Sequence, residues 1–90
     1  MLDFEWDLKK ARANFLKDGV AFLEAVEVFH DELAVTVPDP DHSAPESRYL
    51  TFGATFAGRC LVVSYTERGD TIRVISARTM TPRERRAYED

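Results

Sequence analysis

The sequence has a single cysteine, only four glycines and four prolines, and no long apolar run. The lone cysteine, Cys60, excludes an internal disulfide, and its apolar neighbours favour a buried, inert thiol. The two histidines, His30 and His42, lie in unrelated contexts, so no metal site is predicted. The opening residues MLDFEWD lack the regions of a signal peptide, and no apolar stretch approaches the ~18 residues of a membrane span. We therefore expect a soluble cytoplasmic protein.

Lysine is missing from the second half of the chain, and charge is divided unevenly. Residues 1–46 carry four Lys/Arg against eleven Asp/Glu, a net charge of −7, whereas residues 47–90 carry eight arginines against five Asp/Glu, a net charge of +3. The total of −4 argues against a general nucleic-acid coat. A guanidinium fork can grip phosphate with two hydrogen bonds, so the second half is compatible with a phosphate ligand. For any single arginine the alternative is a solvated strand edge.

Ninety residues, 44% of them apolar and 31% charged, indicate one globular domain over residues 1–90. Asp7 predicts the N-cap of a helix over residues 8–18, which Gly19 ends. Apolar residues at helical spacing predict a second helix over residues 21–33.

Period-two patterning, with a central apolar run in the third segment, predicts four strands, over residues 34–39, 47–56, 59–67 and 71–78. In the second of these strands, four apolar residues share one face: Leu50, Phe52, Ala54 and Phe56. The Pro-, Asp- and Ser-rich stretch over residues 38–47, which contains His42, predicts a loop.

Thr81-Pro82-Arg83-Glu84 is a capping box that begins a last helix. The predicted order is ααββββα, an α+β fold with an antiparallel sheet packed against helices.

The last two predicted strands bring together groups that could cleave RNA. Transesterification needs a base for the 2′-hydroxyl, fixed donors for the phosphorane and an acid for the leaving oxygen. Tyr65, Glu67, Arg73 and Arg78 lie on these strands or at their ends. Arg73 and Arg78 differ by an odd number, so they share a cleft only if a bulge or the strand's end intervenes. Arg78, at that end, is the first candidate.

Each further candidate has a structural alternative. Glu67 is a cross-strand partner for an arginine or a general base. Arg85 and Arg86 form a solvated helix face or a phosphate track. Tyr88 holds the last helix against the sheet or stacks on a base. Trp6 belongs to the core or stacks on RNA.

Three segments, at residues 4–31, 62–78 and 84–89, together resemble the BrnT family of type II toxins. The resemblance implies a RelE-like microbial ribonuclease fold and endonucleolytic RNA cleavage without metal or other cofactor, which inhibits translation. It also implies a BrnA-type ribbon-helix-helix antitoxin as partner, which neutralises the toxin and alone contacts the operator DNA. A homodimer within the complex is a further expectation.

The resemblance also assigns residues. Family motif positions are occupied by Trp6, Lys17, Glu67, Arg73, Arg78, Glu84, Arg85 and Tyr88. We expect catalytic roles for Arg78, Arg73, Glu67, Lys17 and Tyr88, and RNA contacts from Arg85, Arg86, Arg68 and Trp6. Two positions depart from the family pattern: Asp18 stands where histidine is usual, and Thr79 stands where lysine is frequent. Aspartate repels phosphate and is a poor proton donor at neutral pH, so the hypothesis is a weakened or differently tuned nuclease.

Two other functions remain open at this point. The chain could be a non-catalytic scaffold that binds an antitoxin and acts as a corepressor, because a fold never guarantees chemistry. A toxin with another target, such as a topoisomerase, is the third hypothesis. Metal-independent RNA cleavage separates the first hypothesis from both of these.

Overall fold

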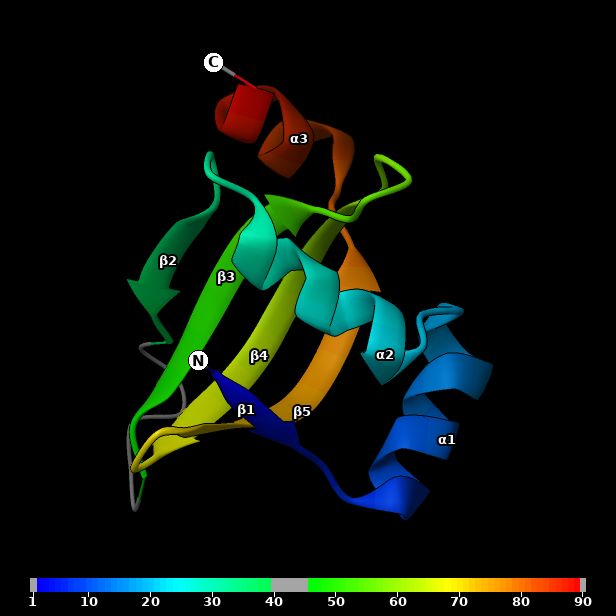
Figure 1. The fold of residues 1–90 in the computed structure, drawn as a ribbon. Helices are drawn as coiled ribbons and strands as arrows, with labels where there is room; N and C mark the ends of the chain where they lie inside the picture. Colours follow the sequence, from blue (N-terminus) through cyan, green and yellow to red (C-terminus); the bar gives the residue numbers. More distant parts are fainter. Residues whose placement is uncertain (1, 40–45, 90) are drawn as a thin grey trace.

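The computed structural model describes residues 2–39 and 46–89. In chain order its elements are β1 (Asp3–Glu5), α1 (Leu8–Asp18), α2 (Phe22–Ala25), the 3₁₀ helix η1 (Val26–His30), β2 (Val35–Pro38), β3 (Arg48–Ala54), β4 (Cys60–Arg68), β5 (Thr71–Thr79) and α3 (Pro82–Glu89). The strands form one sheet in the order β1-β5-β4-β3-β2 (Figure 1). β1 runs parallel to β5, and the other neighbouring pairs are antiparallel. The fold is therefore α+β with a mixed sheet.

The predicted order ααββββα is wrong at its start, because it lacks β1. This strand is too short for period-two alternation to reveal it. It forms through tertiary pairing with β5, in register from Asp3 opposite Thr71 to Glu5 opposite Arg73. The parallel pair makes the sheet mixed rather than antiparallel.

The predicted second helix over residues 21–33 is also corrected. It divides into α2 and η1 and ends at His30. Asp31 then accepts a hydrogen bond from the backbone N–H of Leu33 at 2.9 Å, a local turn that competes with further helix. Most of the loop predicted over residues 38–47, including His42, lies outside the described residues. No helix in the described part of the chain is long and apolar enough to span a bilayer.

The predicted bounds of α1 and the predicted start of α3 are confirmed. The Asp7 carboxylate accepts the N–H groups of two residues in the first turn of α1, at 2.8 and 3.2 Å. Gly19 ends α1 with a φ of 70°, in the left-handed region that glycine enters without a Cβ clash. At α3, Thr81 N–H donates to the Glu84 carboxylate at 2.9 Å, and Glu84 N–H donates to the Thr81 hydroxyl at 3.1 Å.

The core lies between the helices and one face of the sheet, which we call the inner face. Figure 1 shows α2 and η1 crossing in front of this face and α3 beyond the strand ends. The buried cluster consists of Val20, Phe22, Ala25, Val28, Leu61, Val63, Tyr65, Ile72, Val74 and Ala77. β3 turns Thr51 and Gly53 inward, and a Cβ at Gly53 would lie 3.1 Å from that of Val28. The apolar residues Leu50 and Phe52 therefore lie on the opposite, outer face.

A buried asparagine fixes α1 against the sheet. β1 pairs with only the first three residues of β5, so the rest of that edge faces α1. The Asn14 amide donates to the Ala77 carbonyl at 2.9 Å and accepts from the Ala77 N–H at 3.0 Å. It also donates to the Val20 carbonyl at 3.0 Å. Asn14 thus substitutes for a missing strand and places the end of α1 beside the end of β5.

Candidate active site

A β-bulge sets the direction of the two strand arginines that the sequence singles out. In the ladder between β4 and β5, Ser64 pairs with Ser76, but the next residue of β4 pairs with Val74. One residue of β5, at position 75, is therefore extra. The bulge brings Arg73 and Arg78 to the same outer face despite their odd spacing. Arg73 pairs with Thr66, and Arg78 pairs with Val62, four residues earlier on β4. The two arginines are therefore about 13 Å apart along the sheet.

The outer face carries a concavity of about 180 Å³ where the end of α1 meets the centre of the sheet. Its lining residues are Lys17, Asp18, Leu50, Val62, Ser64, Ser76, Ala77 and Arg78. Two cations from separate elements, Lys17 and Arg78, thus share one hollow with the carboxylate of Asp18. The hydroxyls of Ser64 and Ser76 stand opposite each other across the β4–β5 ladder.

Arg78 is held at the edge of this concavity by a carboxylate of α3. Its two terminal nitrogens donate to the two oxygens of Glu84 at 2.8 and 3.0 Å. The hydrogen bond from Arg78 lowers the pKa of Glu84 to about 2. The same bond, with lesser help from the charges of Glu84 and Asp18, raises the pKa of Arg78 above its usual value. The guanidinium therefore stays charged at any physiological pH.

Arg73 and Arg68 are also engaged in ion pairs. Arg73 donates to Glu5 of β1 at 2.7 Å. Arg68, at the β4–β5 hairpin, donates to Glu46 at 3.2 Å. Both pairs are part-exposed, so another anion can compete with the carboxylate for each arginine.

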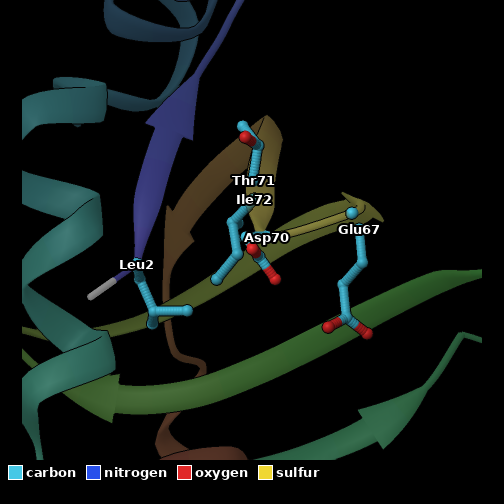
Figure 2. Close-up of a pocket in the computed structure, with 6 residues that line it drawn as sticks. Leu2, Glu67, Asp70, Thr71 and Ile72 are labelled. Atoms are coloured by element: carbon cyan, nitrogen blue, oxygen red, sulfur yellow. The ribbon is translucent and has the colours of Figure 1, made fainter.

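Glu67 lies in a different hollow, at the hairpin end of the sheet. That concavity, of about 480 Å³, is lined by Leu2, Glu67, Gly69, Asp70, Thr71 and Ile72. Figure 2 shows Glu67 on its strand, apart from Leu2 at the start of β1. Glu67 lies five positions along β4 from Val62, the partner of Arg78, which is a distance of about 16 Å, and its side chain is on the opposite face of the sheet. The structure does not bring Glu67 and Arg78 together.

Tyr88 lies near the end of α3, with its hydroxyl donating to the Asp31 carboxylate. Burial and this bond raise the pKa of Tyr88 to about 12, and the same bond lowers the pKa of Asp31. Asp31 also accepts from the Ala54 N–H at 2.8 Å. The contact fastens α3 to the turn after η1, whereas one of the two alternatives from the sequence had Tyr88 hold this helix against the sheet.

The remaining predicted RNA contacts lie outside the concavity. Arg85 reaches Glu89 of its own helix at 3.5 Å, and Arg86 is exposed on α3. Trp6 is half-buried and packs edge-on against Phe22, with ring centroids 5.9 Å apart. Within residues 2–39 and 46–89 no three His, Cys, Asp or Glu side chains cluster in a way that could hold a metal ion.

Ser64 and Ser76 are the site residues that sequence reasoning missed. A serine on a solvent-facing strand position is too common to stand out. The available signal was the spacing on β5, because Ser76 lies two residues before Arg78 and therefore on the same face of the strand, and Ser64 pairs with Ser76.

Comparisons with known proteins agree with this architecture. No curated protein sequence matches the chain significantly. The family model described as the ribonuclease toxin, BrnT, of type II toxin-antitoxin systems matches residues 6–84. The fold is similar to the crystal structure of the Brucella abortus ribonuclease toxin BrnT, with a TM-score of 0.69 and 22% sequence identity over 90% of this chain and 99% of that chain. The chain therefore belongs to the BrnT family of ribonuclease toxins of type II toxin–antitoxin systems.

Proposed function

We propose that this protein is an endoribonuclease that cleaves RNA at the outer-face concavity and needs no metal ion to do so. The observation that carries the proposal is the two-bond contact of Arg78 with a carboxylate, beside Lys17 in the same hollow. A guanidinium fork in that geometry also fits two non-bridging oxygens of a phosphate. Two cations in one hollow can supply the charge stabilisation that a metal ion supplies in other nucleases.

In this proposal the residues of the concavity have separate roles in phosphate binding and proton transfer. Arg78 holds the phosphorane oxygens, and Lys17 neutralises the same phosphate from the end of α1. Arg73 binds a neighbouring phosphate on the same face. Asp18 is the carboxylate positioned to accept the 2′-hydroxyl proton, and a carboxylate is ordinarily a weaker base than imidazole. The proposal therefore includes slow cleavage.

The other predicted residues serve the reaction from a distance. Arg68, Arg85 and Arg86 extend the cationic surface for flanking RNA. Tyr88 acts through α3, which carries the partner of Arg78. Glu67 and Trp6 line other hollows and have no direct role in this scheme.

We further propose a BrnA-type ribbon-helix-helix protein as the antitoxin, with cleavage inhibiting translation in the cytoplasm of a bacterium. Arg78 already donates to a carboxylate of its own chain, so an acidic antitoxin segment could occupy the same fork and exclude RNA. The antitoxin alone would contact operator DNA. Helices before a sheet of hairpins are compatible with the RelE-like microbial ribonuclease fold.

A catalytically weak scaffold that binds the antitoxin is the second candidate. The bond between Arg78 and Glu84, and the presence of Asp18 in the same hollow, favour it, because both carboxylates oppose phosphate. Incubating the purified protein with a long RNA in excess EDTA decides between the two. Endonucleolytic fragments that persist in EDTA support the nuclease, whereas intact RNA at high enzyme concentration favours the scaffold.

A further inference from the structure

The groove between α1 and α2 exposes large apolar side chains that the fold itself does not need there. It has a volume of about 400 Å³ and is lined chiefly by Trp6, Arg12, Phe15, Leu16, Phe22 and Leu23. Phe15 is 55% exposed, Leu16 76% and Leu23 72%. The two helices follow each other along the chain and lie close together on one side of the molecule (Figure 1). Contiguous exposed apolar surface on a small protein marks an interaction site.

One cation lines this groove and a second lies beside it on α1. Arg12 is the charged residue among those that line it, and Lys9 lies on the adjoining helical position of α1. Neither cation forms an ion pair within the described residues. On the side of α2, Glu24 is neutralised by Arg59 at 2.7 Å. Apolar side chains flanked by acidic ones would therefore complement this surface.

We propose that this groove binds an acidic amphipathic helix of a protein partner, the antitoxin. Apolar anchors at helical spacing would fill the hollow between the two helices, and glutamates beside them would meet Lys9 and Arg12. A second copy of this chain fits poorly, because a two-fold contact buries the same surface of both copies, and that surface carries Lys9 and Arg12 with no acidic residue among the described residues that line the groove. A flat lipid surface does not fill a concave groove.

The groove adjoins the concavity around Arg78 through α1. Leu16 lines the groove, and its neighbour Lys17 lines the concavity. A partner helix bound in the groove would place the segment next to it in the partner's chain beside the proposed nuclease site. Binding of the helix itself would not depend on contacts with that site. The identification of the partner as the antitoxin rests on the proposed function, whereas the binding chemistry does not.

The test uses a synthetic, end-capped, 18-residue amphipathic peptide with leucines on one face and glutamates beside them. Its matched partner has lysine in place of every glutamate. Binding of each fluorescently labelled peptide to the full-length protein is followed by anisotropy. The variant Leu16→Ser/Leu23→Ser removes two groove leucines, and Leu33→Ser/Phe56→Ser removes two side chains that are each 75% exposed outside the groove.

We expect the glutamate peptide to bind wild type at least about tenfold more tightly than the lysine peptide. Leu16→Ser/Leu23→Ser weakens binding about tenfold or more, the control pair leaves it unchanged, and Arg12→Glu reverses the preference between the peptides. Circular dichroism shows all variants folded, since the changed leucines are exposed. Equal binding of both peptides, or equal loss in the control pair, overturns the proposal.

Two further outcomes would name a different occupant and so also overturn it. Sedimentation of wild type with phosphatidylcholine–phosphatidylglycerol vesicles, lost in Leu16→Ser/Leu23→Ser, would indicate a membrane surface. Self-association lost in the same variant would indicate a second copy. RNA cleavage in EDTA by Leu16→Ser/Leu23→Ser should equal that of wild type. An absence of cleavage in both proteins would refute the nuclease and leave the groove result standing.

Discussion

Arg78 and Glu84 are joined by two parallel hydrogen bonds, of 2.8 and 3.0 Å, between β5 and the first turn of α3. The same carboxylate accepts the Thr81 N–H that begins the helix. One side chain thus completes the cap of α3 and holds the leading candidate for the catalytic cation. An RNA phosphate that uses the Arg78 fork must displace Glu84, which couples the position of α3 to the occupancy of the site.

Replacing Arg78 should abolish most cleavage without unfolding the chain. Arg78→Ala removes a charged donor whose side chain is 44% exposed, so the fold loses little. Loss of one such donor typically lowers kcat about 10²- to 10³-fold. Arg59→Ala is the matched control, because the pair of Arg59 with Glu24 has nearly the same exposure and lies elsewhere. Single-turnover cleavage of a labelled RNA in EDTA measures both, and equal rates for the two variants would remove Arg78 from the chemistry.

Replacing Glu84 separates its two roles. Glu84→Gln keeps a side-chain acceptor for the Thr81 N–H, because glutamine also serves at this position of a capping box. It removes the charge that competes with phosphate, so we expect KM for RNA to fall about fivefold, the equivalent of about 1 kcal/mol. Glu84→Ala should lower KM likewise but also lower the free energy of unfolding by about 1 kcal/mol. A higher KM in Glu84→Gln would mean that Glu84 positions Arg78 for RNA.

The same ion pair predicts a loss of stability in acid. Arg78 lowers the pKa of Glu84 from 4.5 to about 2, so the folded protein favours the ionised carboxylate. The resulting stabilisation is present above about pH 4.5 and disappears as the pH falls to about 2. The pair is part-exposed, so the difference should be up to about 1 kcal/mol. The free energy of unfolding, measured with urea across this pH range, should fall more steeply for wild type than for Glu84→Gln. The same dependence on pH in both proteins would contradict the assignment.

The parts of the fold predicted from sequence are those with local causes. Asp7 and Gly19 delimit α1, and Thr81 with Glu84 begins α3, because caps are formed by residues within one helical turn. β1 has no such cause. Its three residues become a strand only by pairing with Thr71–Arg73, more than sixty residues later in the chain, and no local pattern records that partner.

The candidate site divides in the same way. Arg78 could be chosen from sequence by residue type and Lys17 by the family resemblance, and the need for a bulge or a strand end between Arg73 and Arg78 followed from their spacing. The bond between Arg78 and Glu84 depends on where α3 lies against β5. Neither the helical nor the strand spacing of apolar residues contains that information. Glu67 is near Arg78 in sequence, yet its strand carries it to the other end of the sheet.

Asp18 should limit the rate of cleavage. It lines the concavity beside Arg78, where the family resemblance leads us to expect histidine. An imidazole titrates near neutrality and can exchange a proton with RNA. A positioned general acid or base typically raises the reaction rate about 10²- to 10⁴-fold. Asp18→His should therefore raise kcat at least about tenfold and introduce a pH dependence near neutrality. Asp70→His, at the β4–β5 hairpin, is the control. Cleavage that is unchanged by Asp18→His would show that another group moves the proton.

Asn14 should be the polar residue on which the placement of α1 depends most. Asn14→Ala leaves the Ala77 N–H and carbonyl and the Val20 carbonyl without their buried partner. Unpaired buried groups cost about 1–3 kcal/mol each before relaxation, so we expect the free energy of unfolding to fall by about 2–4 kcal/mol. Asn14→Asp should be no better, because a carboxylate cannot donate to the two carbonyls.

Lys10→Ala, on the exposed face of the same helix, is the control and should change the free energy of unfolding by less than about 0.5 kcal/mol. Urea unfolding measures all three variants. Because Asn14 fixes the end of α1 beside β5, Asn14→Ala should also raise KM for RNA under conditions where it remains folded, through displacement of Lys17. If Asn14→Ala is as stable as Lys10→Ala, packing of α1, rather than the Asn14 amide, holds Lys17 at the concavity.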